Sequence, residues 1–152
     1  MSDRNRSEQL EGNETEIIRK LTDKCFVLLE EVYRLTSVID SAAKGENFSE
    51  VESLFVKRGE EIQKLTDCEN NLTSFLEQTE DDFDKTLIQN YSDKRIELFR
   101  KIQTVDSEID KLIRKLRDEI LVEMKELYKG RKMQKRYLNT NSAQAGFIDI
   151  KE

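Results

Sequence analysis

Residues 17–43 read IIRKLTDKCFVLLEEVYRLTSVIDSAA, and the apolar side chains in this stretch return every three or four residues. Steps of this kind place the side chains on one face of an α-helix, as in the seam of a coiled coil. Phe26 and Tyr33 widen that face, which a helix needs when it contacts two neighbours. The stretch predicts a long helix in a bundle, with a main stripe of Ile18, Leu21, Cys25, Leu28, Val32, Leu35, Ile39 and Ala42.

Two later stretches carry related patterns. Residues 80–129 repeat the spacing, whereas residues 50–78 follow it less regularly because Arg58 and Glu69 interrupt the apolar positions. We therefore expect two further helices that share the same core. The predicted core includes Leu21, Leu28, Leu35, Leu65, Ile102, Ile109 and Leu112.

Capping residues and glycines suggest where the helices begin and end. The pairs Asn13–Glu16, Ser49–Glu52 and, more weakly, Thr79–Asp82 have the form of capping boxes. Lys44-Gly45 and Lys129-Gly130 are stop signals. The predicted helices run from about 14 to 43, 50 to 78 and 80 to 129, and a break in the third near Ser92 stays open.

Short links make consecutive helices antiparallel neighbours. The predicted fold is all-α, an elongated antiparallel three-helix bundle with coiled-coil-like packing, a long third helix and a flexible basic C-terminal tail. In this division residues 1–12 form a disordered N-terminus, 13–129 the helical bundle, and 130–152 the basic C-terminal segment and tail.

Composition narrows the classes of function. The chain has 152 residues, no proline, no histidine, 38% charged residues and a net charge of −6. Without histidine, a glycine-rich phosphate loop or a nucleophile motif, we expect no enzyme, and we expect no metal and no cofactor. Asp81, Asp82 and Asp84 suit a helix N-terminus, and Cys25 and Cys68 suit a core as reduced thiols. We also expect neither a membrane-inserted segment nor a secretory signal.

The predicted third helix stays apolar at its far end. At about 1.5 Å per residue it measures about 75 Å, against about 45 Å for each of the others, so its end extends past their reach. Apolar side chains without cover need a partner. The sequence leaves open a homodimer or a groove for an amphipathic helix of another protein, lined by Ile113, Leu116, Ile120, Leu121, Met124, Leu127 and Tyr128.

A basic segment follows, with Lys129, Arg131, Lys132, Lys135 and Arg136. Met133 and Tyr137 are four residues apart and share a helix face within it. An aromatic side chain among cations suits docking to an acidic protein surface, although charge runs are also common on solvated faces. Nucleic acid is a poorer partner, because the rest of the chain is acidic. Phe147, Ile148 and Ile150 suit docking back onto the bundle or a short linear motif.

Several segments together resemble the small flagellar type III export chaperones of the FliT and FlgN class. They are the first helix, VKRGEEIQKL in the second, VDSEIDKLIRKLRDEI in the third, and the ending GRKMQKRY. The combination of LRDEI with KMQKRY is closer to FliT, and the resemblance covers about residues 14–138.

The resemblance implies a cytoplasmic chaperone that binds the C-terminal helical segment of a flagellar axial protein, either a filament cap or a hook–filament junction protein. Such a chaperone prevents premature assembly and delivers its substrate to the export gate. It also implies that Tyr137 contacts the gate protein FlhA. Met133, Lys132 and Arg136 lie beside it in the sequence and are further candidates for gate docking, from their spacing and charge. Family members often place glycine after this tyrosine, where this chain has Leu138. The alternative is a structural coiled-coil subunit without a chaperone role.

Overall fold

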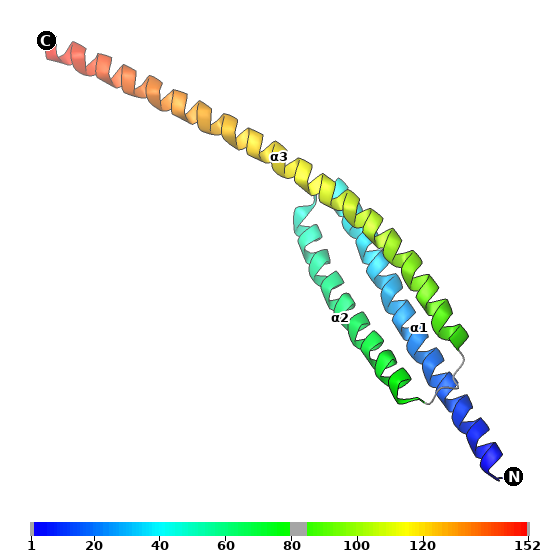
Figure 1. Cartoon of the computed structure of the whole chain (residues 1–152). Coiled ribbons are helices and arrows are strands. Elements are labelled where there is room, and N and C mark those ends of the chain that lie inside the picture. The colour runs from blue at the N-terminus through cyan, green and yellow to red at the C-terminus, as the bar shows by residue number, and fades with distance from the viewer. Residues whose placement is uncertain (1, 80–84, 152) are drawn as a thin grey trace. The chain divides into compact units, whose positions relative to one another are not determined.

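The computed structural model describes the backbone of residues 2–79 and 85–151 and the side chains of residues 12–79 and 85–139. Its helices are α1 (Ser2–Lys44), α2 (Phe48–Gln78) and α3 (Lys85–Lys151) (Figure 1). The predicted all-helical class and the long third helix are confirmed. The chain divides into two compact units, residues 1–110 and residues 111–152, and α3 contributes to both.

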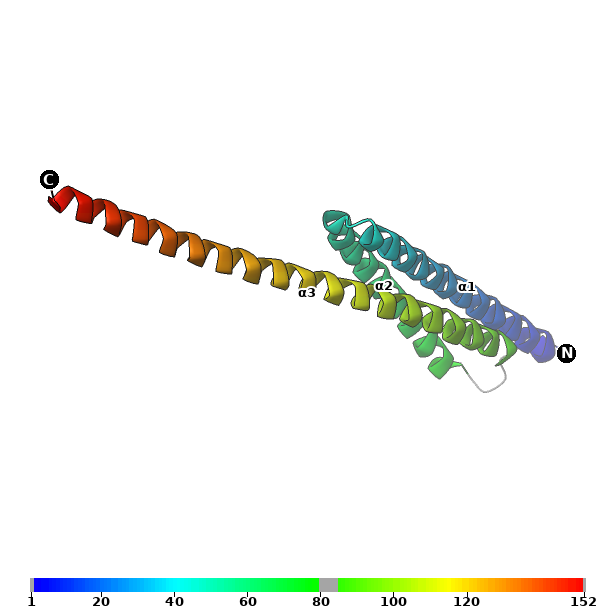
Figure 2. The ribbon, with the colours of Figure 1, turned by 90° about the horizontal axis from the view of Figure 1, so that it is seen from above.

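Within residues 1–110, α2 runs antiparallel to α1. Cys25 of α1 meets Cys68 of α2, and Thr36, further along α1, meets Arg58, which comes earlier in α2. The residue numbers rise on one helix as they fall on the other, as the predicted topology requires. The first part of α3 lies against these two helices, and both views show it beside α1 (Figure 2).

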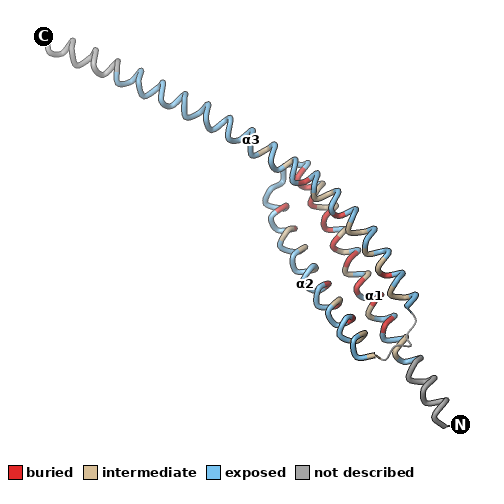
Figure 3. The backbone as a smooth tube through the Cα atoms, viewed as in Figure 1, coloured by how far each residue is buried: buried red, intermediate tan, exposed pale blue. Residues whose placement is uncertain are grey.

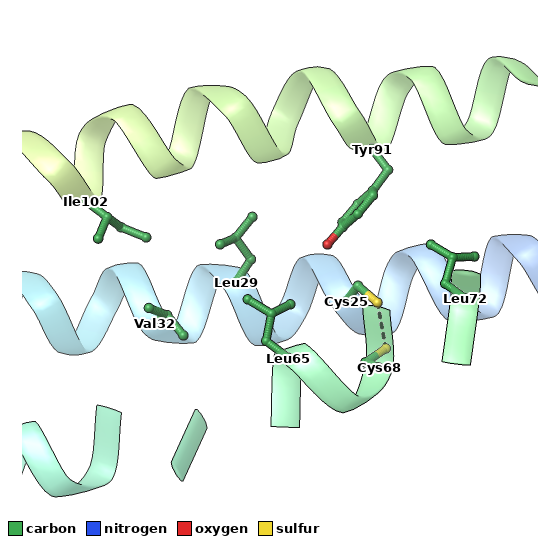
Figure 4. Close-up of a cluster of buried hydrophobic side chains, with 8 residues drawn as sticks. All are labelled: Cys25, Leu29, Val32, Leu65, Cys68, Leu72, Tyr91 and Ile102. Atoms are coloured by element: carbon green, nitrogen blue, oxygen red, sulfur yellow. Dashed lines mark hydrogen bonds between the residues drawn. The ribbon is translucent and has the colours of Figure 1, made fainter. Parts of the chain in front are cut away.

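The core of this unit draws on all three helices (Figure 3). Leu35, Leu65, Ile102 and Ile109 are buried as predicted, whereas Leu21, Leu28 and Leu112 are only half-buried. The central cluster consists of Cys25, Leu29 and Val32 from α1, Leu65, Cys68 and Leu72 from α2, and Tyr91 and Ile102 from α3 (Figure 4).

The buried face of α1 is centred differently from the predicted stripe. Leu29, which the stripe omits, is 0% exposed, and so is Thr36. The hydroxyl of Thr36 donates to the carbonyl of Val32 at 2.7 Å, so its burial leaves no unpaired donor. Because α1 contacts both other helices, its buried face is wider than a two-helix seam. That width explains why Leu29 is covered more completely than Leu28.

The turn between α1 and α2 combines a predicted stop with a cap that the sequence pattern misplaced. α1 ends at Lys44, as Lys44-Gly45 predicts. The backbone N–H of Asn47 donates to the carbonyl of Ala42 at 3.0 Å, and Glu46 takes the left-handed conformation with φ 58°. These are features of a Schellman ending. Asn47 then caps α2 by accepting from the backbone N–H of Glu50, so the predicted box at Ser49–Glu52 is wrong by two residues.

Other helix boundaries also differ from the predicted ones. α1 starts at Ser2 rather than near 14, and α3 passes through Ser92 and Gly130 to Lys151 instead of ending near 129. No proline occurs in the chain, and a single interior Asn or Gly costs a helix only about 1 kcal/mol or less relative to Ala. Thr79 ends α2 instead of starting α3. Asp81, Asp82 and Asp84 lie outside the described residues.

Candidate partner-binding surfaces

The apolar side chains predicted to bind a partner all lie on α3, in the second unit. We call them the apolar face. Six of the seven are exposed, from 37% at Ile113 to 69% at Tyr128, and the remaining one, Leu116, is half-buried. The set consists of Ile113, Leu116, Ile120, Leu121, Met124, Leu127 and Tyr128. This is an exposed apolar surface of the kind that marks an interaction site.

Helical geometry gathers these side chains. Successive residues are turned by about 100° around a helix axis, so steps of three and four keep Ile120, Met124 and Leu127 in one line. Leu121 and Tyr128 are seven residues apart and form a second ridge beside that line. Every residue of the set belongs to α3, so residues 113–128 supply one helical face rather than a groove between two helices.

Beyond Asp110, the sequence pattern missed two exposed apolar residues of α3, Val122 and Leu138. Leu138 is 18 residues after Ile120, which is about five full turns, and therefore continues the line of the apolar face. Val122 is turned by about 100° from Leu121 and lies to the side of that face. Leu138 could have been found by extending the three-four spacing through the basic segment.

The predicted gate-docking residues occupy a different face of α3. Met133 and Tyr137 are exposed and one turn apart, with Lys132 and Arg136 immediately before each. Tyr137 comes nine residues after Tyr128, which turns it by about half a circle around the helix axis. One helix therefore presents two separate aromatic surfaces to two different directions.

A groove in the first unit, between α2 and α3, escaped the sequence pattern. It encloses about 450 Å³, and its lining includes Val32, Leu65 and Ile102. Ile62 of α2 is 42% exposed and also contributes to the lining. Charged side chains, among them Arg58 and Asp106, also line this groove, so its surface is mixed in character.

Two ion pairs span this groove. Arg58 donates to Asp106 at 2.6 Å, and Arg95 donates to Glu69 at 3.0 Å. Arg58 precedes Glu69 on α2, and their partners follow in the opposite order on α3. Both pairs therefore fit one constant register of antiparallel helices. Arg58 and Glu69 are the residues that interrupt the stripe of the second helix, so each interruption is a cross-helix pair. The two pairs could have been predicted from the sequence, because Arg95 and Asp106 on α3 are as far apart as Arg58 and Glu69 on α2 and carry the matching charges.

Glu69 binds two side chains of α3. Its carboxylate accepts from the Tyr91 hydroxyl at 3.1 Å as well as from Arg95. Burial, reinforced by the nearby carboxylate, raises the pKa of Tyr91, and the hydrogen bond from Arg95 to Glu69 raises the pKa of that guanidinium. The Tyr91 hydroxyl and the Arg95 guanidinium thus hold the same carboxylate. The arrangement links α2 to α3.

The described residues also bear on two other kinds of site. No cluster of three or more His, Cys, Asp or Glu side chains suitable for a metal ion occurs among them. None of the helices, within the same residues, has a stretch long and apolar enough to cross a lipid bilayer.

Comparison with known proteins adds independent information. The model of the family described as "Flagellar protein FliT" matches residues 26–139, about three-quarters of the chain. The matched range takes in α1 from Phe26 onward, all of α2, and α3 as far as Asn139, so it contains both the apolar face and the basic segment. No curated protein and no solved structure matches the chain.

Proposed function

The chain belongs to the FliT flagellar protein family, whose members are non-enzymatic flagellar export chaperones, and from this premise we propose how it engages its partners. The apolar face of α3 binds the C-terminal helical segment of a flagellar axial protein, a filament cap or hook–filament junction protein. The bound segment is kept from premature assembly in the cytoplasm. The basic segment around Tyr137 then docks the complex to the export gate protein FlhA.

The exposure of the apolar face is the observation that carries this proposal. Described residues 117–139 are all exposed, although the stripe there has the same spacing as in the core. An amphipathic helix that lays its apolar side along this face would complete a coiled-coil seam. Burying a Leu or Ile side chain contributes about 1.5–3 kcal/mol before the costs of association are subtracted. A few such contacts are enough for specific binding.

The decisive variant is Leu121→Asp, and Val122→Asp is its matched control. Both residues are exposed apolar residues of the same helix, and both changes add one negative charge. Only Leu121 belongs to the apolar face. We expect Leu121→Asp to weaken binding of an axial protein's C-terminal segment at least about tenfold, about 1.4 kcal/mol, with Val122→Asp close to wild type. Isothermal titration with purified cap and junction protein fragments measures both affinities.

The same titration separates the chaperone from a structural coiled-coil subunit. Light scattering of the free protein shows whether it is a monomer or a homodimer. If Leu121→Asp dissociates a homodimer but leaves axial-protein binding unchanged, the apolar face serves assembly of this chain with itself, and the chaperone assignment of that face is wrong. Equal affinities for wild type, Leu121→Asp and Val122→Asp would also contradict it.

Gate docking rests on the second aromatic surface. Tyr137 is 68% exposed, and five cations lie between Lys129 and Arg136. Cations of this kind steer association with an acidic surface. At physiological ionic strength, salt screens the interaction between exposed charges more than about 8 Å apart. Affinity for the gate domain should therefore fall as salt rises above that strength.

Tyr137→Ala tests the docking role, with Tyr128→Ala as the control of equal size and similar exposure. We expect Tyr137→Ala to abolish binding of the purified FlhA cytoplasmic domain while axial-protein binding is unchanged or tighter. Tyr128→Ala should show the reverse pattern. If both variants bind the gate domain like wild type, Tyr137 has no docking role.

A further inference from the structure

Two thiols lie in the core of the first unit, whereas both proposed surfaces belong to the second unit. Cys25 of α1 is 0% exposed and Cys68 of α2 is 3% exposed. Their sulfur atoms are 2.6 Å apart and point toward one another (Figure 4). Both cysteines are free thiols. Because the S–S bond of a disulfide measures about 2.05 Å, a shift of about half an ångström brings the two atoms to bonding distance.

The antiparallel register of α1 and α2 produces this contact. Thr36 and Arg58, further along the same interface, meet in almost the same register, at 3.2 Å. The Cys68 sulfur also lies 3.6 Å from the carbonyl oxygen of Leu21, one turn before Cys25. The meeting of the thiols is therefore a consequence of how the two helices pack along their length.

We propose that Cys25 and Cys68 form a redox-sensitive dithiol, which a peroxide converts to an intramolecular disulfide linking α1 to α2. One sulfur, as its thiolate, attacks a peroxide oxygen; the O–O bond breaks, water leaves after protonation, and a sulfenic acid remains. The second sulfur displaces the sulfenic oxygen as a second water and forms the S–S bond. The peroxide is reduced by two electrons, and the protein loses two hydrogen atoms.

The surroundings make this reaction slow in the closed bundle. Burial raises the pKa of the Cys25 thiol to about 12, and Cys68 and Glu69 on α2 reinforce the effect, whereas a hydrogen bond with Tyr91 on α3 opposes it. The thiolate is the reactive form, so little of Cys25 is available near neutral pH. Oxidation should accelerate under conditions that open the interface between α1 and α2.

Once formed, the disulfide should stabilise the bundle. It closes a loop that includes the α1–α2 turn and much of α2, which restricts the unfolded chain. The expected result is a rise in Tm of about 5 °C or more, reversed by a thiol reductant. The effect needs no axial protein or gate protein, so its success or failure is independent of the proposed function.

The test treats the full-length wild-type chain with hydrogen peroxide, denatures it, alkylates the remaining thiols and measures intact mass. A cross-linked monomer should lack two hydrogen atoms, take up no alkylating reagent and yield a peptide pair joining Cys25 to Cys68. Its melting curve is compared before and after reduction. Cys25→Ala and Cys68→Ala, treated alike, should show no intramolecular cross-link and no reversible rise in Tm.

Three results would overturn the proposal. One is wild-type protein that keeps both thiols after peroxide has fully oxidised glutathione in the same tube. Another is oxidation to sulfinic acid or to a disulfide-linked dimer without the intramolecular link. The third is a cross-linked monomer whose Tm does not change on reduction. All three are measured on wild-type protein, so they remain informative even if the alanine variants fold poorly.

Discussion

Two parts of α3 share one sequence pattern and differ in what covers it. Between Lys85 and Asp110, the positions Tyr91, Ile102 and Ile109 are buried by the other helices. Beyond Asp110 the same three-four spacing continues, but Ile120 and Leu127 are exposed. The comparison shows that the spacing predicts a helix face that will pack. It does not say whether the cover comes from the same chain or from another protein.

The charged residues between the apolar positions also differ between the two parts. In the bundle, Arg95 pairs with Glu69 and Asp106 pairs with Arg58, so polar side chains next to the groove are matched across helices. Such pairs fix the register, since an unpaired charge in a half-buried position is costly. In residues 111–139, each residue belongs to the same helix, so no second described helix of that unit supplies matching charges. Both cross-helix pairs therefore belong to the first unit.

The largest change in the free energy of unfolding is expected where apolar side chains are buried by the other helices. Leu29→Ala should lower the free energy of unfolding by about 2–5 kcal/mol, because the side chain is 0% exposed and its removal leaves a cavity. Leu28→Ala, at the half-buried neighbouring position, should cost distinctly less. Guanidinium chloride unfolding followed by circular dichroism measures both. A larger loss at Leu28 than at Leu29 would mean that the buried face of α1 is misassigned.

A smaller loss in the free energy of unfolding should appear at alkaline pH. Because the folded state raises the pKa of Cys25 from 9.0 to about 12, its contribution to stability is complete below pH 9 and declines as pH rises toward 12. We expect a loss on the order of 1–2 kcal/mol between pH 9 and 10.5, measured with reductant present. Cys25→Ala should reduce this dependence without removing it, because Tyr91 also has a raised pKa. Identical pH profiles for the two proteins would contradict the burial of a neutral thiol.

The smallest change in the free energy of unfolding is expected at the apolar face of α3, where the side chains are exposed. Leu127→Ala should change the free energy of unfolding of the free protein by no more than about 0.5 kcal/mol, since the side chain is 63% exposed. The same substitution at Leu29 is the internal reference. A loss above about 1 kcal/mol at Leu127 would show that the apolar face is covered in the free protein, by the chain itself or by a second copy.

Much of the fold was accessible from the sequence because helical spacing reports directly on burial. The stripe placed Leu35, Leu65 and Ile109 correctly. It missed Leu29, because a helix between two neighbours buries a wider face than one seam. The cap at Asn47 was missed because Ser49–Glu52 offers a competing box two residues later, and hydrogen-bond geometry decides between them.

The candidate surfaces were predicted less completely. The residues of the apolar face and of the basic segment were identified from spacing and charge, and their exposure agrees with a binding role. The groove between α2 and α3 was not predicted, since it depends on how far apart two helices lie. The identity of a partner is not encoded in spacing at all. The resemblance of several segments indicated flagellar proteins, and the family match agrees with it.

Hydrogen–deuterium exchange of the full-length chain, alone and with an axial protein's C-terminal segment, tests the central claim most directly. In the free protein, amides of the core helices within residues 17–110 should be protected, and those of residues 113–128 should exchange faster, because fewer packed contacts hold that part of α3. Adding the segment should slow exchange in residues 113–128. The account is contradicted if residues 113–128 are already as protected as the core in the free monomer, or if new protection appears along the α2–α3 groove and not on the apolar face.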